Sequence, residues 1–390
     1  KSEEKMEAYL DNSATTKCLD EVKDIVVKTM MEDFGNPSSK HLAGVYAERY
    51  LKEAREAIAK TMKVTEKEIF FTSGGTEADN WAILGTAFAN QRQGKHIITS
   101  SVEHAAVLEP MRYLEENGFD VTYLNVDRYG RVDLEQLKEA ITEETILVSV
   151  MYVNNEIGTL EPIEEIAQII KEKNPKTIFH VDAIQAYGKY RIYPKKIGID
   201  LLSVSGHKIH GPKGTGFLYI NEKVKIKPFI LGGGQQKGMR SGTDNVPGVA
   251  GLGTAARLSY ESYEEKWNHL LKLKKSFMEQ VSEIEKITFN NLPEAESAPH
   301  IVSVSFEGVR SEVLLHAMEE RGIYISAGSA CSSNKKQTAS HTLVAVHMPK
   351  ALLDCTVRFS FCEMTTMEEI TYCAETLKQI VPMLRRYARR

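Results

Sequence analysis

Residues 199–208 read Ile-Asp-Leu-Leu-Ser-Val-Ser-Gly-His-Lys, an apolar run that ends in small residues and a lysine. Such a run predicts a strand covered on both faces, as in a parallel sheet between helices. Lys208 then lies at the strand end and is expected to point into a cleft. Partial burial lowers the pKa of an amine and makes it nucleophilic, although most lysines are simply solvated.

A carboxylate ends the preceding strand. Residues 177–185 read Thr-Ile-Phe-His-Val-Asp-Ala-Ile-Gln, and Asp182 closes the apolar part. A buried carboxylate is costly unless a cation lies opposite, and a protonated pyridine nitrogen would be such a cation. Pyridoxal 5'-phosphate needs an acid to keep its ring an electron sink and an amine to hold it. Asp182 and Lys208 together therefore indicate this cofactor.

Composition narrows the class of protein. The chain has 390 residues, 42% of them hydrophobic, and a formal net charge of −4. This length favours two domains, and the charge gives no basic field for nucleic acid. No apolar run reaches the length of a membrane span. Five cysteines without paired metal-type spacing indicate a reducing compartment, so we expect a cytoplasmic protein.

The first two thirds of the chain alternate strands and helices. Strands are expected over 69–72, 96–99, 121–124, 146–151, 177–182, 199–205 and 217–220. This alternation predicts an α/β fold with a mostly parallel sheet, whose ligands collect at the carboxyl ends of the strands. Four polar residues fall at or just beyond such ends: His104, Asn155, Asp182 and Lys208. Ser73-Gly74-Gly75-Thr76 links a strand to a helix and could bind an anion, although a simple turn explains it as well.

The last third changes character. A long helical stretch is expected from about Val246 to Ile287, followed by a strand over 301–306, a helix over 311–322, a strand over 357–361 and a closing helix from Thr366. We therefore expect a large domain over residues 15–255. Residues 1–14 and 256–390 would form a smaller α+β domain.

Assembled in order, these motifs resemble the cysteine desulfurases of the NifS/IscS family, which belong to the class V aminotransferases of fold type I. The resemblance runs almost end to end. Besides the segments around Asp182 and Lys208, it rests on residues 9–16 (Tyr-Leu-Asp-Asn-Ser-Ala-Thr-Thr), 35–39 (Gly-Asn-Pro-Ser-Ser), 72–80 (Thr-Ser-Gly-Gly-Thr-Glu-Ala-Asp-Asn), 153–159 (Val-Asn-Asn-Glu-Ile-Gly-Thr), 240–243 (Arg-Ser-Gly-Thr), 328–333 (Gly-Ser-Ala-Cys-Ser-Ser) and 357–360 (Val-Arg-Phe-Ser). The fold it implies is a large domain with a seven-stranded sheet and a smaller C-terminal domain.

The resemblance also implies roles around the cofactor. Lys208 would hold the aldehyde and then move the substrate α-proton, while Asp182 would pair with the pyridine nitrogen. Gln185 would donate to the phenolic oxygen, and His104 would stack on the ring and assist proton transfer. The phosphate would be held by Gly75, Thr76, Ser205 and His207. Thr243 would reach the phosphate of the neighbouring subunit, which implies a homodimer.

The substrate implied by the resemblance is L-cysteine. Arg358 offers a planar fork for its carboxylate, which a lysine could not match. Asn155 would assist, although Asn154 beside it is an alternative, and Asn12 completes the expected substrate-binding set. Departures from the family pattern include Lys17, Cys362 and a Val346-His347 pair where glycine is common.

Cys331 separates a desulfurase from an ordinary aminotransferase. Its neighbours are small and polar, so its thiolate is expected to be exposed and nucleophilic. It would take the sulfur of L-cysteine as a persulfide, release alanine and pass the sulfur to an acceptor protein of iron–sulfur cluster, tRNA-thiolation or thiamine synthesis. The other four cysteines are expected to be packing residues.

Three alternatives remain open or are set aside. A selenocysteine lyase or another class V enzyme on the same fold stays possible, because the sequence does not distinguish sulfur from selenium. A non-catalytic regulatory module would need a DNA-binding segment that the chain does not offer. A metal site of His180, Asp182, His207 and His210 is set aside, because such spacings are common by chance.

Overall fold

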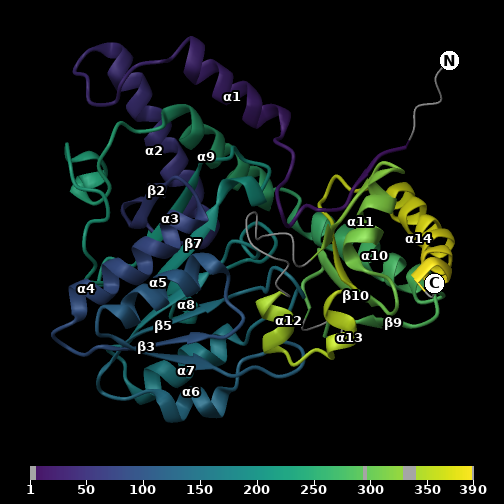
Figure 1. Ribbon diagram of the computed structural model, residues 1–390. Coiled ribbons are helices and arrows are strands. Elements are labelled where there is room, and N and C mark those ends of the chain that lie inside the picture. Colours follow the sequence, from purple (N-terminus) through teal and green to yellow (C-terminus); the bar gives the residue numbers. More distant parts are fainter. Residues whose placement is uncertain (1–5, 293–296, 328–339, 389–390) are drawn as a thin grey trace.

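The computed structural model describes residues 6–292, 297–327 and 340–388. Its central element is a seven-stranded sheet (Figure 1). In spatial order the strands are β2 (Ile69–Thr72), β8 (Gly216–Ile220), β7 (Leu201–Ser205), β6 (Ile178–Asp182), β5 (Thr145–Met151), β3 (His96–Ser100) and β4 (Asp120–Leu124). All neighbours are parallel except β8, which is antiparallel to both β2 and β7. The prediction of a mostly parallel seven-stranded sheet is confirmed.

Helices cover both faces of this sheet, which explains the continuous apolar runs of its strands. On β7, Leu202 and Val204 enter one core while Leu201 enters the other. The helices of the first core are α2 (Leu42–Met62), α6 (Leu134–Ala140), α7 (Ile163–Lys173) and α9 (Val246–Tyr260), with α1 (Asp20–Met31) packed outside α9. Those of the second are α3 (Gly75–Asn80), the π-helical turn η2 (Trp81–Gly85), α4 (Thr86–Asn90) and α5 (Ala105–Glu116).

The C-terminal part builds its own core on a smaller antiparallel sheet (Figure 1). The strand order is β12 (Ser326–Ala327), β13 (Thr356–Ser360), β10 (Ile301–Phe306) and β9 (Ile287–Phe289). Three helices pack on it: α10 (Tyr263–Val281), α11 (Ser311–Glu319) and α14 (Met367–Ala388). The start of the chain joins this part, because β1 (Ala8–Tyr9) pairs with β11 (Ile323–Tyr324) and Leu10 enters its core.

Short elements complete the described chain. They are η1 (Glu66–Glu68), α8 (Pro194–Ile197), η3 (Gly206–Lys208), η4 (Gln235–Gly238), α12 (His341–Ala345) and α13 (Lys350–Leu353). His347, one of the expected departures from the family pattern, follows α12 and has a φ of 55°. The backbone is therefore left-handed there even though the residue carries a side chain.

One expected element is wrong. The stretch from Val246 to Ile287 is two helices, because the chain turns between α9 and α10 at Glu261 and Ser262. Ser262 has a φ of 50°, a left-handed conformation that no α-helix can contain. Tyr260 and Tyr263 stack across the turn with ring centroids 6.0 Å apart, so the apolar pattern continues while the helix does not.

Among the described residues, no helix combines the length and apolarity needed to span a membrane.

Candidate active site

The predicted lysine and carboxylate end neighbouring strands at one edge of the large sheet. β6 ends at Asp182, and β7 leads into η3, whose last residue is Lys208. The Nζ atom of Lys208 donates to the main-chain carbonyls of Ser13 at 2.5 Å and Ala14 at 2.7 Å. Gln185 Nε2 also donates to the Ser13 carbonyl, at 3.0 Å. The segment before α1 therefore lines the site, and it collects the side chains of Lys208 and Gln185 at one point.

Asp182 lies in a setting that favours a cationic partner. Its side chain is almost completely buried, and its Oδ1 accepts a hydrogen bond from the Ile184 N–H at 2.9 Å. Burial raises the pKa of Asp182 to about 6, against the opposing effects of that hydrogen bond and of the Lys208 charge. Asp79 is also fully buried nearby, where burial and the charge of Asp182 raise its pKa. A protonated ring nitrogen beside Asp182 would supply the missing positive charge.

The predicted phosphate cradle lies where α3 begins. Gly74 has a φ of 150°, and a Cβ on Gly75 would lie 2.2 Å from Ile184 Cδ1 and 3.5 Å from Ser205 Cβ. Glycine therefore lets the start of the helix approach the end of β7, where Ser205 is buried. α3 continues through η2 into α4, so its first N–H groups belong to a long helix and can bind an anion. These donors fit the phosphate of the expected cofactor.

Two histidines of the predicted site are neutral at pH 7. His207 Nδ1 lies 3.1 Å from Thr15 Oγ1, and burial lowers the pKa of His207 to about 4. His104 caps α5, because its Nδ1 accepts from the Ala106 N–H at 3.1 Å. Burial, followed by the charges of Lys208 and His341, lowers the pKa of His104. The proton of the neutral His104 ring therefore lies on Nε2, and an uncharged ring is suited to stacking on the cofactor.

Glu103, which the sequence analysis did not single out, supports the loop that carries His104. Its Oε1 accepts from Ser100 Oγ at 2.6 Å and from the Met151 N–H at 3.0 Å. The side chain is fully buried, and burial raises the pKa of Glu103 to about 8. Its neutral form therefore ties the ends of β3 and β5 together. In the sequence, only the position of Glu103 directly before His104 could have indicated that Glu103 supports this loop.

This burial predicts a pH-dependent stability. Glu103 keeps its proton up to pH about 8 in the folded chain, but its ordinary pKa is 4.5. Since the folded state then binds one more proton between these values, the free energy of unfolding should fall as pH rises from 4.5 to about 8. Glu103→Gln should remove this pH-dependent decrease in the free energy of unfolding, which is on the order of a few kcal/mol. Urea unfolding across this range should give a flatter profile for Glu103→Gln than for wild type or the exposed control Glu116→Gln. Parallel profiles would contradict the assignment.

The expected substrate-binding residues meet where the two parts of the chain adjoin. Arg358 Nη1 donates to the Asn155 carbonyl at 2.6 Å, and Nη2 donates to Asp11 Oδ1 at 2.9 Å. The Asn154 side chain is buried, with Nδ2 donating to the Val102 carbonyl and Oδ1 accepting two backbone N–H groups. Asn12 Nδ2 donates to the carbonyls of Tyr9 and Ser360. Asn154 is thus fixed within the protein, and Asn155 is the less buried of the pair.

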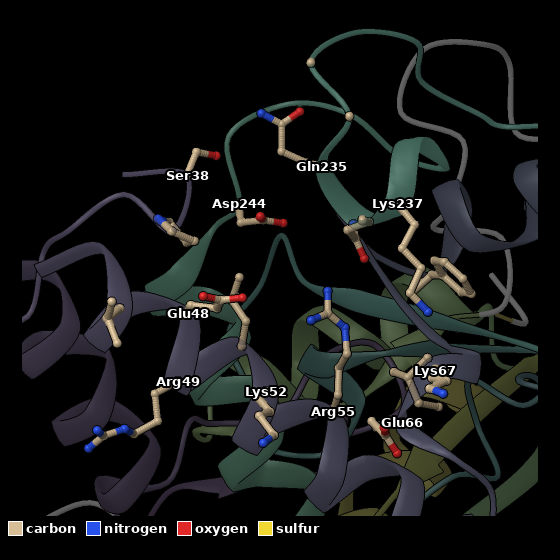
Figure 2. A pocket seen from close by; sticks show the side chains of 18 residues that line it. Ser38, Glu48, Arg49, Lys52, Arg55, Glu66, Lys67, Gln235, Lys237 and Asp244 are labelled. Atoms are coloured by element: carbon tan, nitrogen blue, oxygen red, sulfur yellow. The ribbon is translucent and has the colours of Figure 1, made fainter. Parts of the chain in front are cut away.

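Thr243 lies on a glycine-rich loop and is exposed. Arg240 anchors this loop to α3 through a two-pronged contact with Glu77, at 2.8 and 3.1 Å. Between the loop and α2 is a cavity of about 740 Å³ (Figure 2). Arg49, Lys52 and Arg55 on α2 are among its lining residues, and the guanidinium of Arg55 points into it, whereas neither Lys208 nor His104, the described members of the predicted catalytic set, lines it.

Cys331 lies outside the described residues. After that gap, Ser340 caps α12 and contacts Glu156, and His341 Nε2 lies 2.7 Å from the Glu103 carbonyl. Of the other cysteines, Cys355, Cys362 and Cys373 are buried, as expected for packing residues. Cys18 is exposed, so the prediction that it is a packing residue is wrong; it lies in the extended segment before α1, outside the three hydrophobic cores.

His180 belongs to the metal site that was set aside on the sequence, and its contacts give it a different role. His180 is fully buried between Ser149 Oγ and Ser203 Oγ, each 2.8 Å from a ring nitrogen. Burial lowers the pKa of His180 to about 3. It is therefore a neutral core histidine that links three strands.

The chain is similar to known proteins over almost its whole length. The family profile of the class V aminotransferases matches residues 8–373. A cysteine desulfurase IscS of Methanosarcina thermophila is 46% identical over 384 residues, covering 98% of this chain and 94% of that relative. A putative cysteine desulfurase IscS 1 of Bacillus subtilis (strain 168) is 44% identical over 377 residues, covering 96% and 99%. The solved structure of a NifS-like protein superposes with a TM-score of 0.92 at 38% identity, covering 97% of this chain and all of that one.

The chain therefore belongs to the class V aminotransferases, and it is a pyridoxal-phosphate enzyme with the fold expected of them. The full-length similarity to several desulfurases then narrows the assignment. Within that family it is a cysteine desulfurase of the IscS/NifS type.

Proposed function

We propose that the edge of the large sheet around Lys208 carries out the desulfurase reaction on L-cysteine. The observation that carries this proposal is the placement of Asp182 and Lys208 at neighbouring strand ends, beside the cradle of Gly75 and Ser205. When bound there, pyridoxal phosphate supplies an electron sink conjugated to the substrate α-carbon.

Each residue around the cofactor has a role that its contacts support. Lys208 would hold the aldehyde of the cofactor, and its free amine would move the substrate α-proton. Asp182 would pair with the ring nitrogen, and Gln185 would donate to the phenolic oxygen. Neutral His104 would stack on the ring and assist proton transfer.

The phosphate is held by donors at the start of α3 and the end of β7. Gly75 and Thr76 contribute from the helix, and Ser205 and His207 contribute from the strand end. Their support is the close approach of the two elements, which the absence of a Cβ on Gly75 permits.

The substrate carboxylate binds beside Arg358, with Asn155 assisting. The guanidinium is already oriented by Asp11 and by the Asn155 carbonyl. Asn12 acts by holding the segment before α1 against β13, since its Nδ2 bonds the Ser360 carbonyl.

Cys331 takes the sulfur. Its thiolate attacks the substrate sulfur, forming an S–S bond as the substrate C–S bond breaks. The electron pair of the C–S bond stays on carbon, which takes up a proton, so alanine leaves and a persulfide remains on Cys331. An acceptor protein with a thiol then receives the sulfur, for iron–sulfur clusters or for thio-modified cofactors and tRNA.

A single-turnover assay tests this assignment. Wild type with L-cysteine should give equal amounts of alanine and protein-bound sulfane sulfur. Cys331→Ala should keep the visible absorption band of the bound cofactor but form neither product, because the nucleophile is gone. If Cys331→Ala makes alanine as fast as wild type, Cys331 is not the sulfur acceptor, and a lyase is the better description.

We also propose a homodimer with composite sites. Exposed apolar side chains on α1, on α2, in the segment between them and on the glycine-rich loop support an interface there: Val27, Met30, Met31, Phe34, Leu42, Val45, Tyr46 and Leu231. Phe34 is 76% and Leu231 81% exposed, and so large a group of apolar side chains marks an interaction surface. The cavity of Figure 2 borders the same surface, and Thr243 lies next to its lining residue Asp244. Thr243 would there reach the partner's phosphate.

Two further assignments complete the proposal. The chain divides into a domain of residues 15–255 and a second one of residues 1–14 and 256–390, supported by the packing of Ala8 and Leu10 with α10, α11 and α14. A cytoplasmic location is supported by Cys18, Cys355, Cys362 and Cys373, which are all free thiols.

A further inference from the structure

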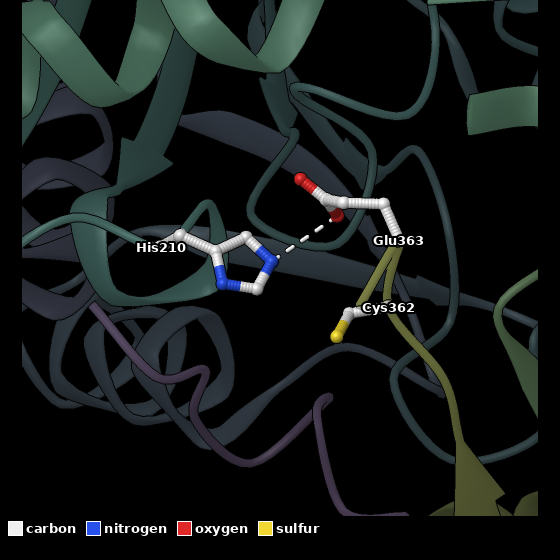
Figure 3. A group of neighbouring side chains, drawn as sticks. All are labelled: His210, Cys362 and Glu363. Atoms are coloured by element: carbon white, nitrogen blue, oxygen red, sulfur yellow. Dashed lines mark hydrogen bonds and ion pairs between the residues drawn. The ribbon is translucent and has the colours of Figure 1, made fainter. Parts of the chain in front are cut away.

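A second group of reactive side chains lies where the two parts of the chain meet (Figure 3). His210 comes two residues after Lys208, and Cys362 and Glu363 follow β13. One nitrogen, one sulfur and one carboxylate oxygen of these residues all lie within 4.8 Å of one another. The group is largely buried, and none of the three residues has a role in the proposed desulfurase reaction.

The His210 ring is oriented as a metal ligand would be. Its Nδ1 lies 2.7 Å from the Lys17 carbonyl, so Nδ1 carries a proton and donates it. Nε2 points at Glu363 Oε2, 3.1 Å away (Figure 3). Histidines that bind metals typically donate their other ring N–H to a carbonyl in this way. The backbone of His210 has a φ of 62°, a conformation uncommon for a side-chain-bearing residue.

Cys362 is also supported from behind. Its N–H donates to Thr365 Oγ1 at 3.0 Å, and the same hydroxyl lies 3.7 Å from the sulfur and can donate to it. A hydroxyl donor stabilises a thiolate. Two of the three candidate ligands therefore already have the outer partners that a metal site needs.

We propose that His210, Cys362 and Glu363 form a binding site for a divalent cation of the zinc class. Zinc takes nitrogen, sulfur and carboxylate ligands at about 2.0–2.3 Å, which places neighbouring ligand atoms roughly 3–4 Å apart. The nitrogen–oxygen separation of 3.1 Å is close to this range. Three protein ligands leave a fourth position for water, and His210 and Cys362 both line a cavity of about 450 Å³.

The charges around the site are compatible with the cation. A neutral His210, a Cys362 thiolate and a Glu363 carboxylate together supply two negative charges, which balance a divalent cation. The neighbouring ammonium groups of Lys189 and Lys266 therefore face no net positive charge from the occupied site. Lys266 lies 3.8 Å from Glu363 Oε1 and leaves Oε2 for the metal.

The site would join two segments that are far apart in sequence. His210 follows the loop of the catalytic lysine, whereas Cys362 and Glu363 follow β13, which carries Arg358. A bound ion would clamp these segments together. Because it binds the folded chain alone, it should stabilise the protein.

The test uses cofactor-loaded protein with the Cys331→Ser change, which removes the loop thiol as a competing ligand. After chelation and equilibrium dialysis against zinc, elemental analysis should find one zinc per chain. Adding Cys362→Ser should weaken zinc binding by more than about 10- to 100-fold, the cost of losing even an outer partner. Adding Cys18→Ser, the exposed control, should leave it unchanged. When cobalt(II) is added in place of zinc, a sulfur-to-metal charge-transfer band should appear in the parent and in the Cys18→Ser protein but not in the Cys362→Ser protein.

Stability separates a lost site from a damaged fold. Without zinc, the Cys362→Ser protein should melt near the parent temperature, and zinc should raise the Tm of the parent only. Glu363→Gln, which keeps the shape of the side chain, should also lose tight zinc binding. Equal zinc content in the parent and the Cys362→Ser protein, or no bound zinc in the parent, would overturn the proposal.

Discussion

Lys208→Ala should give a folded protein that lacks the visible absorption band of the bound cofactor and has lost its desulfurase activity. In the proposed function the amine is both the covalent anchor of the cofactor and the base for the α-proton, and general base catalysis alone contributes about 10²–10⁴-fold. Its Nζ also donates to the Ser13 and Ala14 carbonyls. In the variant the buried Ser13 carbonyl keeps the hydrogen bond from Gln185 Nε2, and water can reach the carbonyl of the exposed Ala14. We therefore expect little loss of stability.

Lys213→Ala is the matched control, because Lys213 is an exposed lysine five residues further along the same loop. It should keep the absorption band and the activity. Absorbance, circular dichroism and alanine release distinguish the variants. A Lys208→Ala protein that turns over at the wild-type rate would rule out Lys208 as the catalytic lysine.

The same variant tests the composite site. In the proposed homodimer, a site consists of Lys208 from one chain and Thr243 from its partner. A mixed dimer of a Lys208→Ala chain and a Thr243→Ala chain then has one site with both changes and one with neither. Co-refolded mixtures should thus be more active than the average of the two parents. Activity that never exceeds this average would contradict a shared site.

The fold was predictable where burial on both faces left a clear pattern. The sequences of β6 and β7 are apolar because helices cover both faces of the sheet. In such folds the polar residues that bind ligands follow the carboxyl ends of the strands. Asp182 and Lys208 could therefore be placed at one edge before any contact was known. The turn at Ser262 was not predictable, because stacked Tyr260 and Tyr263 continue the apolar pattern across it.

The partners of the site residues were harder to predict. Arg358 bonds Asp11, 347 positions away, and Lys208 bonds backbone carbonyls that have no sequence signature. Glu103 is buried by strands that meet only in the folded chain. Local patterns indicate which residues bear the chemistry, whereas long-range packing decides their orientation and pKa.

Asp182→Asn should have the second largest effect, with turnover falling on the order of 10²–10³-fold, as when one preorganised electrostatic group is removed. Asparagine has the shape of aspartate, and its Oδ1 can still accept from the Ile184 N–H. What it lacks is the negative charge that, in the proposed function, keeps the ring nitrogen of the cofactor protonated. The variant should therefore still bind the cofactor, less tightly, while kcat falls much more than KM rises.

Asp200→Asn provides the control. Burial raises the pKa of Asp200 to about 6 as well, and its Oδ2 accepts from the Phe179 N–H at 2.9 Å. Asp200 precedes β7, so it lies at the opposite edge of the sheet from Asp182. If loss of a buried, hydrogen-bonded carboxylate were damaging in itself, both variants would be inactive. If the charge beside the cofactor is what matters, only Asp182→Asn loses turnover, and steady-state kinetics with cofactor titrations separates the two explanations.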